Sequence, residues 1–332
     1  MAGSILITGS NGSLALPAVK YLLEAYPSFT LLLTVRDDSP QDINTTELRR
    51  LLAHHPHASA SILKLDLSSL ANVHKFSDAL LSEIQAGSLP RLRAIICNAM
   101  SWSLSGPAKY SKEGYELSTA INHLAHFSLC LRLLRGMDRM RGRIVFVGSA
   151  AHWPDRARLS RGFPTQIPKE LELLVHPQPD AEGEEMGRGF QRYGTSKLVA
   201  VMVMYEFNNR LRANKDTESI RAVVVDPLDL VNSRAFFQPH VPGHFQIVVS
   251  VMNWLLPLLG RIAPRFVTVE AAAKPVVEVA VADRFEGQEG YFEGEIKAES
   301  SPDSRDGEVQ KALWRKSVEW CGLEGGDIII DV

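Results

Sequence analysis

The stretch SILITGSNGSLA, residues 4–15, decides the fold that the sequence predicts. Its apolar start indicates a short buried strand, and a glycine-containing turn then leads into residues 14–23, which have helical character. A strand, a tight loop and a helix in this order suit nucleotide binding, because backbone N–H groups and the helix N-terminus face a pyrophosphate. The spacing is G-x-x-G-x-x-A rather than G-x-G-x-x-G, so the loop by itself fits a plain structural turn equally well.

Short apolar strands alternate with helical segments along most of the chain. We expect further strands at residues 29–35, 61–67, 93–97, 143–147 and 220–225, and helices at 47–54, 73–84, 115–134 and 193–211. Because parallel strands need long crossover connections, this alternation predicts an α/β fold with a Rossmann-type, doubly wound parallel sheet. No repeat, low-complexity tract or linker interrupts it, so residues 1–332 are predicted to form a single domain.

The composition is typical of a soluble globular enzyme. Hydrophobic residues make up 45% and charged residues 22% of the 332 residues, and the net charge of −2 gives no reason to expect nucleic acid as a partner. Three distant cysteines, Cys97, Cys130 and Cys321, show no metal-ligand spacing. We therefore expect packed thiols, no metal site and a reducing, cytoplasmic location. No secretory signal pattern precedes the first strand.

Two segments depart from the alternation of strands and helices. Residues 150–192 are rich in proline, glycine and charge, which favours a lid or binding insertion, with a disordered surface loop as the alternative for its acidic half. A short helix is expected at 171–174. Residues 247–262 are apolar but are interrupted by polar and helix-breaking residues, and they fall short of a ~20-residue membrane span. A buried or lid helix is the favoured interpretation there, and a monotopic membrane contact is the alternative.

The end of the second strand bears on the choice of dinucleotide. An NAD site has an acidic residue there to bind the ribose 2′-hydroxyl, but this chain has Arg36, whose guanidinium suits a 2′-phosphate. Asp37 and Asp38 follow directly, and a surface arginine is the alternative interpretation. The sequence favours NADP(H) over NAD.

Tyr193 and Lys197 are spaced to share one face of a helix. A tyrosine titrates near pH ~10, and a nearby cation lowers that pKa because it favours the phenolate. The pair therefore suits a proton donor or acceptor at a reacting oxygen, although the same spacing also arises by chance on many helices.

Four motifs follow one another at the expected strand ends: Thr8-Gly9, Asn98-Ala99, Ser149 and Tyr193-x-x-x-Lys197. As a set they resemble the short-chain dehydrogenase/reductase family, over nearly the whole chain. The run NHLAHF at residues 122–127 resembles the retinol dehydrogenase and protochlorophyllide reductase branch. Similar chains occur among fungal oxidoreductases, some of them in secondary metabolism.

The resemblance implies a catalytic role for four residues. Tyr193 would be the acid/base, Lys197 would lower its pKa and bind the nicotinamide ribose, and Ser149 would hydrogen-bond the substrate oxygen. Asn122 would hold a water in a proton relay through Lys197. Such roles fit hydride transfer to a ketone, because donors aimed at the developing alkoxide stabilise it by ~3–4 kcal/mol each.

The resemblance also implies a cofactor site along one edge of the sheet. Asp66 would bind the adenine edge, the segment at Asn98 would shape the pocket, and the segment after Asp226 would lie beside the nicotinamide amide. The residues expected to bind NADP(H) are Thr8, Gly9, Ser10, Asn11, Gly12, Ser13, Leu14, Arg36, Asp66, Leu67, Asn98, Ala99, Met100, Tyr193, Lys197, Pro227, Leu228 and Leu230.

The chain departs from the family pattern at several positions. Ser13 and Ala15 stand where the family usually has glycines, Met100 replaces the glycine of N-A-G, and Leu228 replaces the glycine of P-G. These differences bear on cofactor affinity. The long separation of Ser149 and Tyr193 indicates an insertion that shapes the substrate pocket.

The function predicted from these observations is hydride transfer between NADP(H) and a carbonyl or alcohol of a lipophilic small molecule. Residues 228–265 would form the substrate-binding loop and helices, and their apolar content motivates the lipophilic substrate. The alternatives are a biosynthetic enzyme of the same fold that works without net redox, as an isomerase, dehydratase or cyclase, and a non-catalytic dinucleotide sensor. A monomer or a homodimer is expected.

Overall fold

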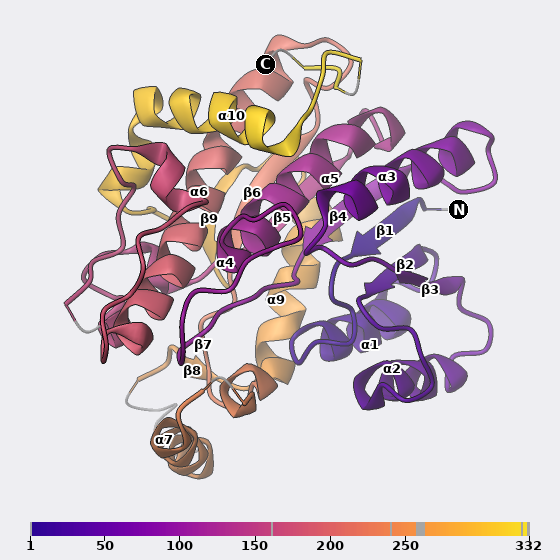
Figure 1. Cartoon of the computed structure of the whole chain (residues 1–332). Helices are drawn as coiled ribbons and strands as arrows, with labels where there is room; N and C mark the ends of the chain where they lie inside the picture. Colours follow the sequence, from indigo (N-terminus) through magenta and orange to yellow (C-terminus); the bar gives the residue numbers. More distant parts are fainter. Residues whose placement is uncertain (1, 161, 240, 257–262, 327, 331–332) are drawn as a thin grey trace.

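The computed structural model describes residues 2–160, 162–239, 241–256, 263–326 and 328–330. Within these residues, eight strands form one sheet in the order β10-β9-β6-β5-β4-β1-β2-β3 (Figure 1). The strands are β1 (Ser4–Ile7), β2 (Thr30–Val35), β3 (Ala60–Lys64), β4 (Leu92–Cys97), β5 (Arg143–Val147), β6 (Arg221–Asp226), β9 (Gly290–Glu293) and β10 (Ile296–Ala298). All neighbours are parallel except β9 and β10, which confirms the predicted Rossmann-type sheet.

Helices cover both faces of this sheet (Figure 1). One face packs against α3 (Leu70–Gln85), α5 (His126–Leu133), α6 (Glu185–Ala213) and α10 (Gly307–Cys321). The other face packs against α1 (Ala15–Ala25), α2 (Ile43–Ala53) and α9 (Val269–Val281). Every residue of β1, β2 and β4 is buried, as expected for strands covered on both sides.

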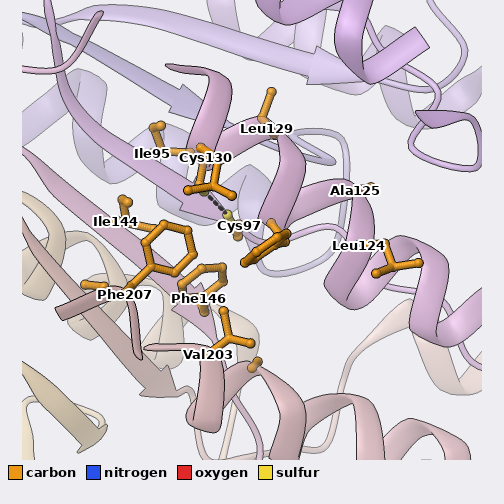
Figure 2. Close-up of a cluster of buried hydrophobic side chains, with 14 of the residues drawn as sticks. Ile95, Cys97, Leu124, Ala125, Leu129, Cys130, Ile144, Phe146, Val203 and Phe207 are labelled. Carbon is orange, nitrogen blue, oxygen red and sulfur yellow. Dashed lines mark hydrogen bonds between the residues drawn. The ribbon is translucent and has the colours of Figure 1, made fainter. Parts of the chain in front are cut away.

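One large core cluster lies between the sheet and helices α5 and α6. Figure 2 shows side chains from β4, β5 and both helices meeting there, among them Ile95, Phe146 and Phe207. The Sγ atoms of Cys97 and Cys130 lie 3.6 Å apart in the same cluster. All three cysteines are free and buried, so the expectation that they pack as small hydrophobic residues is confirmed.

Strand order reverses between β4 and β1, and this places a crevice at the carboxyl ends of the strands. Thr8 follows β1, Asn98 follows β4, Ser149 follows β5, and Asp226 ends β6. The fold therefore brings the predicted strand-end residues to one edge of the sheet.

The helix that carries Tyr193 begins earlier than predicted, at Glu185, so the last part of the predicted 150–192 insertion is helical. Glycines in its first turns suggested a loop, but they serve close packing. A Cβ at Gly189 would lie 1.8 Å from the carbonyl oxygen of Ser103, and one at Gly187 would lie 2.7 Å from the carbonyl oxygen of Ser160.

The interpretation of the acidic half of the insertion as a disordered surface loop is also wrong. Asp180 forms a bidentate pair with Arg192 at 2.6 and 2.8 Å, and its carboxylate is almost fully buried. The expected short helix at 171–174 is present as one 3₁₀ turn, Leu171–Leu174.

The predicted helix over residues 115–134 is not uniform. It consists of α4 (Leu117–Thr119), a π-helical segment (Ala120–Ala125) that contains Asn122, and α5. Single π turns inside α-helices often mark functional sites, because the extra residue redirects side chains.

The described part of the apolar segment 247–262 is largely an exposed helix, so the buried-helix interpretation is wrong for these residues and the lid interpretation stays a prediction. Its described part belongs to α7 (Gly243–Trp254), where Ile247 is 66% and Trp254 is 80% exposed, and residues 257–262 lie outside the described residues. Helix α7 lies apart from the two layers that cover the sheet (Figure 1). The strands β7 (Asp229–Leu230) and β8 (Phe266–Val267) precede and follow this segment in the sequence, and they pair as a short parallel sheet. No helix in the described ranges is long and apolar enough to cross a membrane.

Candidate active site

The loop after β1 has two glycines that the geometry requires. Gly9 has a left-handed φ of +63°, and a Cβ there would lie 3.0 Å from the Cβ of Ala99. A Cβ at Gly12 would lie 3.0 Å from the carbonyl oxygen of Gly9. No side chain caps the N-terminus of α1, which starts at Ala15. This bare backbone at a helix N-terminus is a cradle suited to a phosphate.

Thr8 holds this loop against the end of β4. Its Oγ1 accepts hydrogen bonds from the backbone N–H groups of Asn98 and Ala99, both at 3.0 Å. The side-chain amide of Asn98 in turn donates to the carbonyl oxygens of Thr8 and Gly9, at 2.9 and 3.2 Å. The predicted Asn98-Ala99 motif therefore acts on the glycine loop itself.

His126 belongs to this arrangement although sequence analysis assigned it no role. Its Nε2 lies 2.9 Å from Thr8 Oγ1. Because Oγ1 already accepts two bonds, the Thr8 hydroxyl donates to His126. Burial lowers the pKa of His126 to about 4, so the ring is neutral and able to accept. The second histidine of the NHLAHF run was the only signal for this contact.

Tyr193, Ser149 and Lys197 meet at the carboxyl ends of β5 and β6. Burial raises the pKa of Tyr193 to about 12, and a hydrogen bond with Ser149 opposes this rise. Lys197 Nζ lies 5.6 Å from the centroid of the Tyr193 ring and donates to the carbonyl oxygen of Val147 at 2.8 Å. The expected lowering of the Tyr193 pKa by Lys197 is not found in this structure, where burial is the largest influence and the Ser149 hydrogen bond is the one that lowers the pKa.

Burial lowers the pKa of Lys197 to about 8, and the nearby charge of Asp226 opposes this effect. Asp226 is itself buried and accepts from Arg265 at 2.8 Å, from the Tyr291 hydroxyl at 3.0 Å and from the Leu228 N–H at 2.9 Å. The end of β6 therefore places a carboxylate that accepts from three donors close to Lys197.

Leu228 has the left-handed backbone that favours glycine, with a φ of +69°. The family's usual glycine at this position therefore has a conformational cause, and this chain keeps the conformation with a leucine, at a cost of ~1–2 kcal/mol. Pro227 is buried, and Leu230 pairs with Val267 between β7 and β8.

The side chain of Asn122 makes three hydrogen bonds to neighbouring residues. Its side-chain oxygen accepts from the Ser101 N–H at 2.7 Å, and its amide donates to the Ser101 carbonyl and to Ser196 Oγ, both at 2.9 Å. Ser196 donates to the carbonyl oxygen of Tyr193 at 2.7 Å. Asn122 thus connects the π-helical segment to the helix that carries the tyrosine.

Other predicted cofactor residues lie around the same crevice. Ser10 is buried and donates to the carbonyl oxygen of Ile7, while the amide of Asn11 donates to Asp42 and Thr45 at the start of α2. Ser13 accepts from Arg234, and Leu14 is buried at the start of α1.

Arg36 and Asp66 also lie at strand ends. Arg36 follows β2, is exposed, and contributes to low pKa values of the nearby Asp37 and Asp66. Asp66 accepts from the backbone and hydroxyl of Ser68, and Leu67 beside it is buried.

Aromatic rings surround Tyr193 on the side opposite the sheet. Its ring centroid lies 5.3 Å from that of Trp102 and 5.6 Å from that of Phe190, and Trp102 lies 5.4 Å from Phe236. Met100, the residue in place of the usual glycine, packs against this cluster. Phe236 lies in the predicted substrate-binding segment 228–265, whereas no signal in the sequence indicated Trp102 and Phe190, because neither belongs to a recognisable pattern.

His152 has a structural role. It is fully buried, its Nδ1 lies 2.8 Å from the Ser149 carbonyl oxygen, and its Nε2 accepts from the Ser301 N–H at 3.1 Å. Within the described residues, no group of three or more histidine, cysteine, aspartate or glutamate side chains is placed to hold a metal ion.

Two family profiles match the chain. One, described as short chain dehydrogenase, matches residues 4–158, and the other, described as AcuH dehydrogenase domain, matches residues 235–329. The second covers α7 and the helices after it.

Several known proteins are similar in sequence. A short chain dehydrogenase, macD, of Penicillium terrestre is 30% identical over 75% of this chain and 72% of its own length. A short-chain dehydrogenase, iccH, of Talaromyces variabilis is 27% identical over 99% of this chain and 98% of its own. Protochlorophyllide reductase A of Arabidopsis thaliana is 26% identical over 97% and 77%.

The NADPH-bound carbonyl reductase from chicken fatty liver has a similar fold. Its TM-score is 0.57 at 14% identity, with 90% of this chain and 99% of that chain covered.

Proposed function

The chain belongs to the short-chain dehydrogenase/reductase family, and on that premise we propose that it is an oxidoreductase that transfers a hydride between NADP(H) and a carbonyl or alcohol of a lipophilic small molecule. The observation that carries the proposal is that Tyr193, Ser149 and Lys197 lie close together in a chain whose first loop has glycines at 9 and 12. At both glycines a Cβ would crowd neighbouring atoms. The fungal relatives are consistent with a role in secondary metabolism.

The residues at the crevice fit a dinucleotide. The bare loop at Gly9 and Gly12 would hold the diphosphate at the N-terminus of α1, and Arg36 would face a 2′-phosphate. Lys197 would bind the nicotinamide ribose, and the segment from Pro227 to Leu230 would flank the nicotinamide. When bound, the nicotinamide supplies or accepts the hydride.

Tyr193 and Ser149 would act on the substrate oxygen. With a pKa raised to about 12, Tyr193 keeps its proton at neutral pH and is ready to donate it to an oxygen that gains negative charge. Ser149 already hydrogen-bonds the phenol, so the two hydroxyls are neighbours. A reacting carbonyl oxygen would sit within hydrogen-bonding reach of both. In the reverse direction the same phenol, once deprotonated, would take the alcohol proton.

Lys197 and Asn122 would support this proton transfer. A protonated Lys197 stabilises the phenolate that forms after donation, and Asp226 favours the protonated lysine. Asn122 would serve the proposed proton relay through Lys197, while its contacts with Ser101 and Ser196 fix the π-helical segment beside it.

The surroundings of Tyr193 favour an apolar substrate. Trp102, Phe190 and Phe236 form an aromatic wall, and it continues through Phe245 to α7. On the surface, α7 and Phe237 line an open depression of about 470 Å³. We propose that residues 1–332 act as one domain, in which the 150–192 and 228–265 segments shape the substrate site.

A direct test is to mix the protein with NADPH or NADH and a panel of ketones of increasing apolar surface, and to follow loss of the reduced-nicotinamide absorbance. We expect oxidation of NADPH, faster than of NADH, with aryl or long-chain ketones preferred over short ones. Failure to bind either dinucleotide would contradict the proposal. Conversion of substrate with no change in its redox state, seen by product mass, would instead support an isomerase, dehydratase or cyclase.

A further inference from the structure

Arg234 begins a 3₁₀ turn, Arg234–Phe237, on the substrate side of the molecule, yet its contacts lie on the cofactor side. Its backbone N–H donates to Ser13 Oγ at 2.9 Å, and its Nε donates to the same oxygen at 3.3 Å. One terminal nitrogen donates to the carbonyl oxygen of Asn11 at 2.6 Å. The other donates to Asn44 at 2.5 Å and to Glu47 at 3.1 Å, both on α2.

These bonds fix the direction of the Ser13 hydroxyl. Its oxygen accepts two hydrogen bonds from Arg234, which occupy both lone pairs, so its own hydrogen must point in the remaining direction. In the described part of the chain that hydrogen has no acceptor. Ser13 lies between Gly12 and the uncapped N-terminus of α1, where the loop presents its bare backbone.

We infer that Arg234 is a positioning residue for the dinucleotide diphosphate, and this rests on the proposed function. Arg234 orients Ser13 as a hydrogen-bond donor to the diphosphate, and its guanidinium, which is also paired with Glu47, lies at the loop. Ser13 stands where a glycine is usual. The pair Ser13–Arg234 therefore replaces a bare backbone position with an oriented hydroxyl and a cation.

The same contact joins the two sides of the crevice. Phe236, two residues after Arg234, packs against Trp102, which packs against Tyr193. Arg234 thus fixes the start of the substrate segment on the cofactor loop, so that the aromatic wall and the diphosphate site share one anchor.

The test measures the Kd of NADPH and of adenosine 2′-monophosphate, which has no diphosphate, for the wild type, Arg234→Gln, Ser13→Ala and the double variant. Arg50→Gln is the matched control, because Arg50 is an exposed arginine on α2, the helix that Arg234 contacts. A hydrogen bond to a charged group is worth roughly 10-fold or more in affinity, so each single variant should bind NADPH about 10-fold more weakly. The double variant should lose much less NADPH affinity than the product of the two single-variant losses, because Arg234 acts through Ser13. Binding of the monophosphate, and of NADPH by the control, should not change.

If Arg234→Gln binds NADPH as tightly as the wild type does, the inference is overturned and the proposed function still stands. Equal weakening of both ligands would also overturn it, since a general loosening of the site does not depend on the diphosphate. If circular dichroism shows that Arg234→Gln does not fold, the test rests on Ser13→Ala. Undiminished NADPH binding by Ser13→Ala would then refute the inference. Absence of NADPH binding by the wild type would overturn the proposed function together with it.

Discussion

The loop after β1 and helix α7 lie on two sides of the same crevice and are held by different forces. Buried and partly buried hydrogen bonds among Thr8, Asn98 and His126 fix the loop from three separate elements. Helix α7 contains no aspartate, glutamate, lysine or arginine. Its Val249 is buried and Phe245 is partly buried, whereas Ile247 and Trp254 are exposed.

This difference indicates what each region recognises. A dinucleotide presents the same phosphates and ribose in every reaction, so a rigid, hydrogen-bonded loop suits it. An apolar substrate is recognised by non-directional burial, which requires surface area rather than fixed donors. We therefore expect changes in the loop to affect folding and cofactor binding, and changes in α7 to affect substrate affinity.

The largest effect is expected outside both regions, at Tyr193. Tyr193→Phe removes the proton donor but keeps a ring among Trp102 and Phe190, so kcat should fall by ~10²–10⁴-fold with the fold intact. Steady-state kinetics and circular dichroism check this. Tyr205→Phe on the same helix, whose hydroxyl bonds Ser300, is the control and should stay active. A fully active Tyr193→Phe would refute the assigned mechanism.

The next largest effect concerns the rigid loop. Gly9→Ala combines a left-handed backbone, costing ~1–2 kcal/mol, with a Cβ 3.0 Å from that of Ala99. We expect a lower free energy of unfolding and at least ~10-fold weaker NADPH binding. Gly87→Ala shares the left-handed φ but has nothing within 4 Å, so it should lose stability alone. Equal NADPH affinity in the two variants would contradict the proposed rigid cradle.

A third prediction concerns pH. Because Lys197 loses its proton as the pH rises through about 8, the rate of carbonyl reduction should decline above that pH. Asp226 favours the protonated lysine, so Asp226→Asn should move this decline to lower pH. An unchanged profile in Asp226→Asn would show that another group controls the decline.

The same lysine makes an opposite prediction for stability. Its pKa in the folded protein is below its ordinary value of 10.5, so the unfolded chain binds more protons between about 8 and 10.5. The contribution of Lys197 to the free energy of unfolding should therefore rise with pH in this window. Denaturant unfolding of the wild type and Lys197→Met across that range would reveal the rise as a difference between the two.

The smallest effect is expected on α7. Trp254→Ser changes an exposed side chain, so the free energy of unfolding should stay within ~0.5 kcal/mol. The KM for an apolar ketone should rise several-fold, while kcat and the Kd of NADPH stay the same. Ser250→Ala, in the same surface depression, serves as the control. A large loss of stability in Trp254→Ser would mean that α7 is part of the folding core.

Much of the cofactor side was predictable because its signals are local. The glycines at 9 and 12 follow a strand and precede a helix, and Tyr193 and Lys197 are one helical turn apart. The structure of the 150–192 insertion was harder to predict. Gly187 and Gly189 indicate a helix break until their close approach to Ser160 and Ser103 is known.

The sequence by itself determined the parallel sheet, the order of the strand-end motifs and the family. The sheet follows from the alternation of strand and helix patterns, which local residue periodicity controls, and the family follows from the resemblance of the whole set of motifs to it. Tertiary structure alone decided that Arg234 reaches Ser13, that His126 reaches Thr8 and that Trp102 faces Tyr193. The two residues of each pair are 91 to 221 positions apart in the sequence, and only the packing of the elements onto the sheet brings them together.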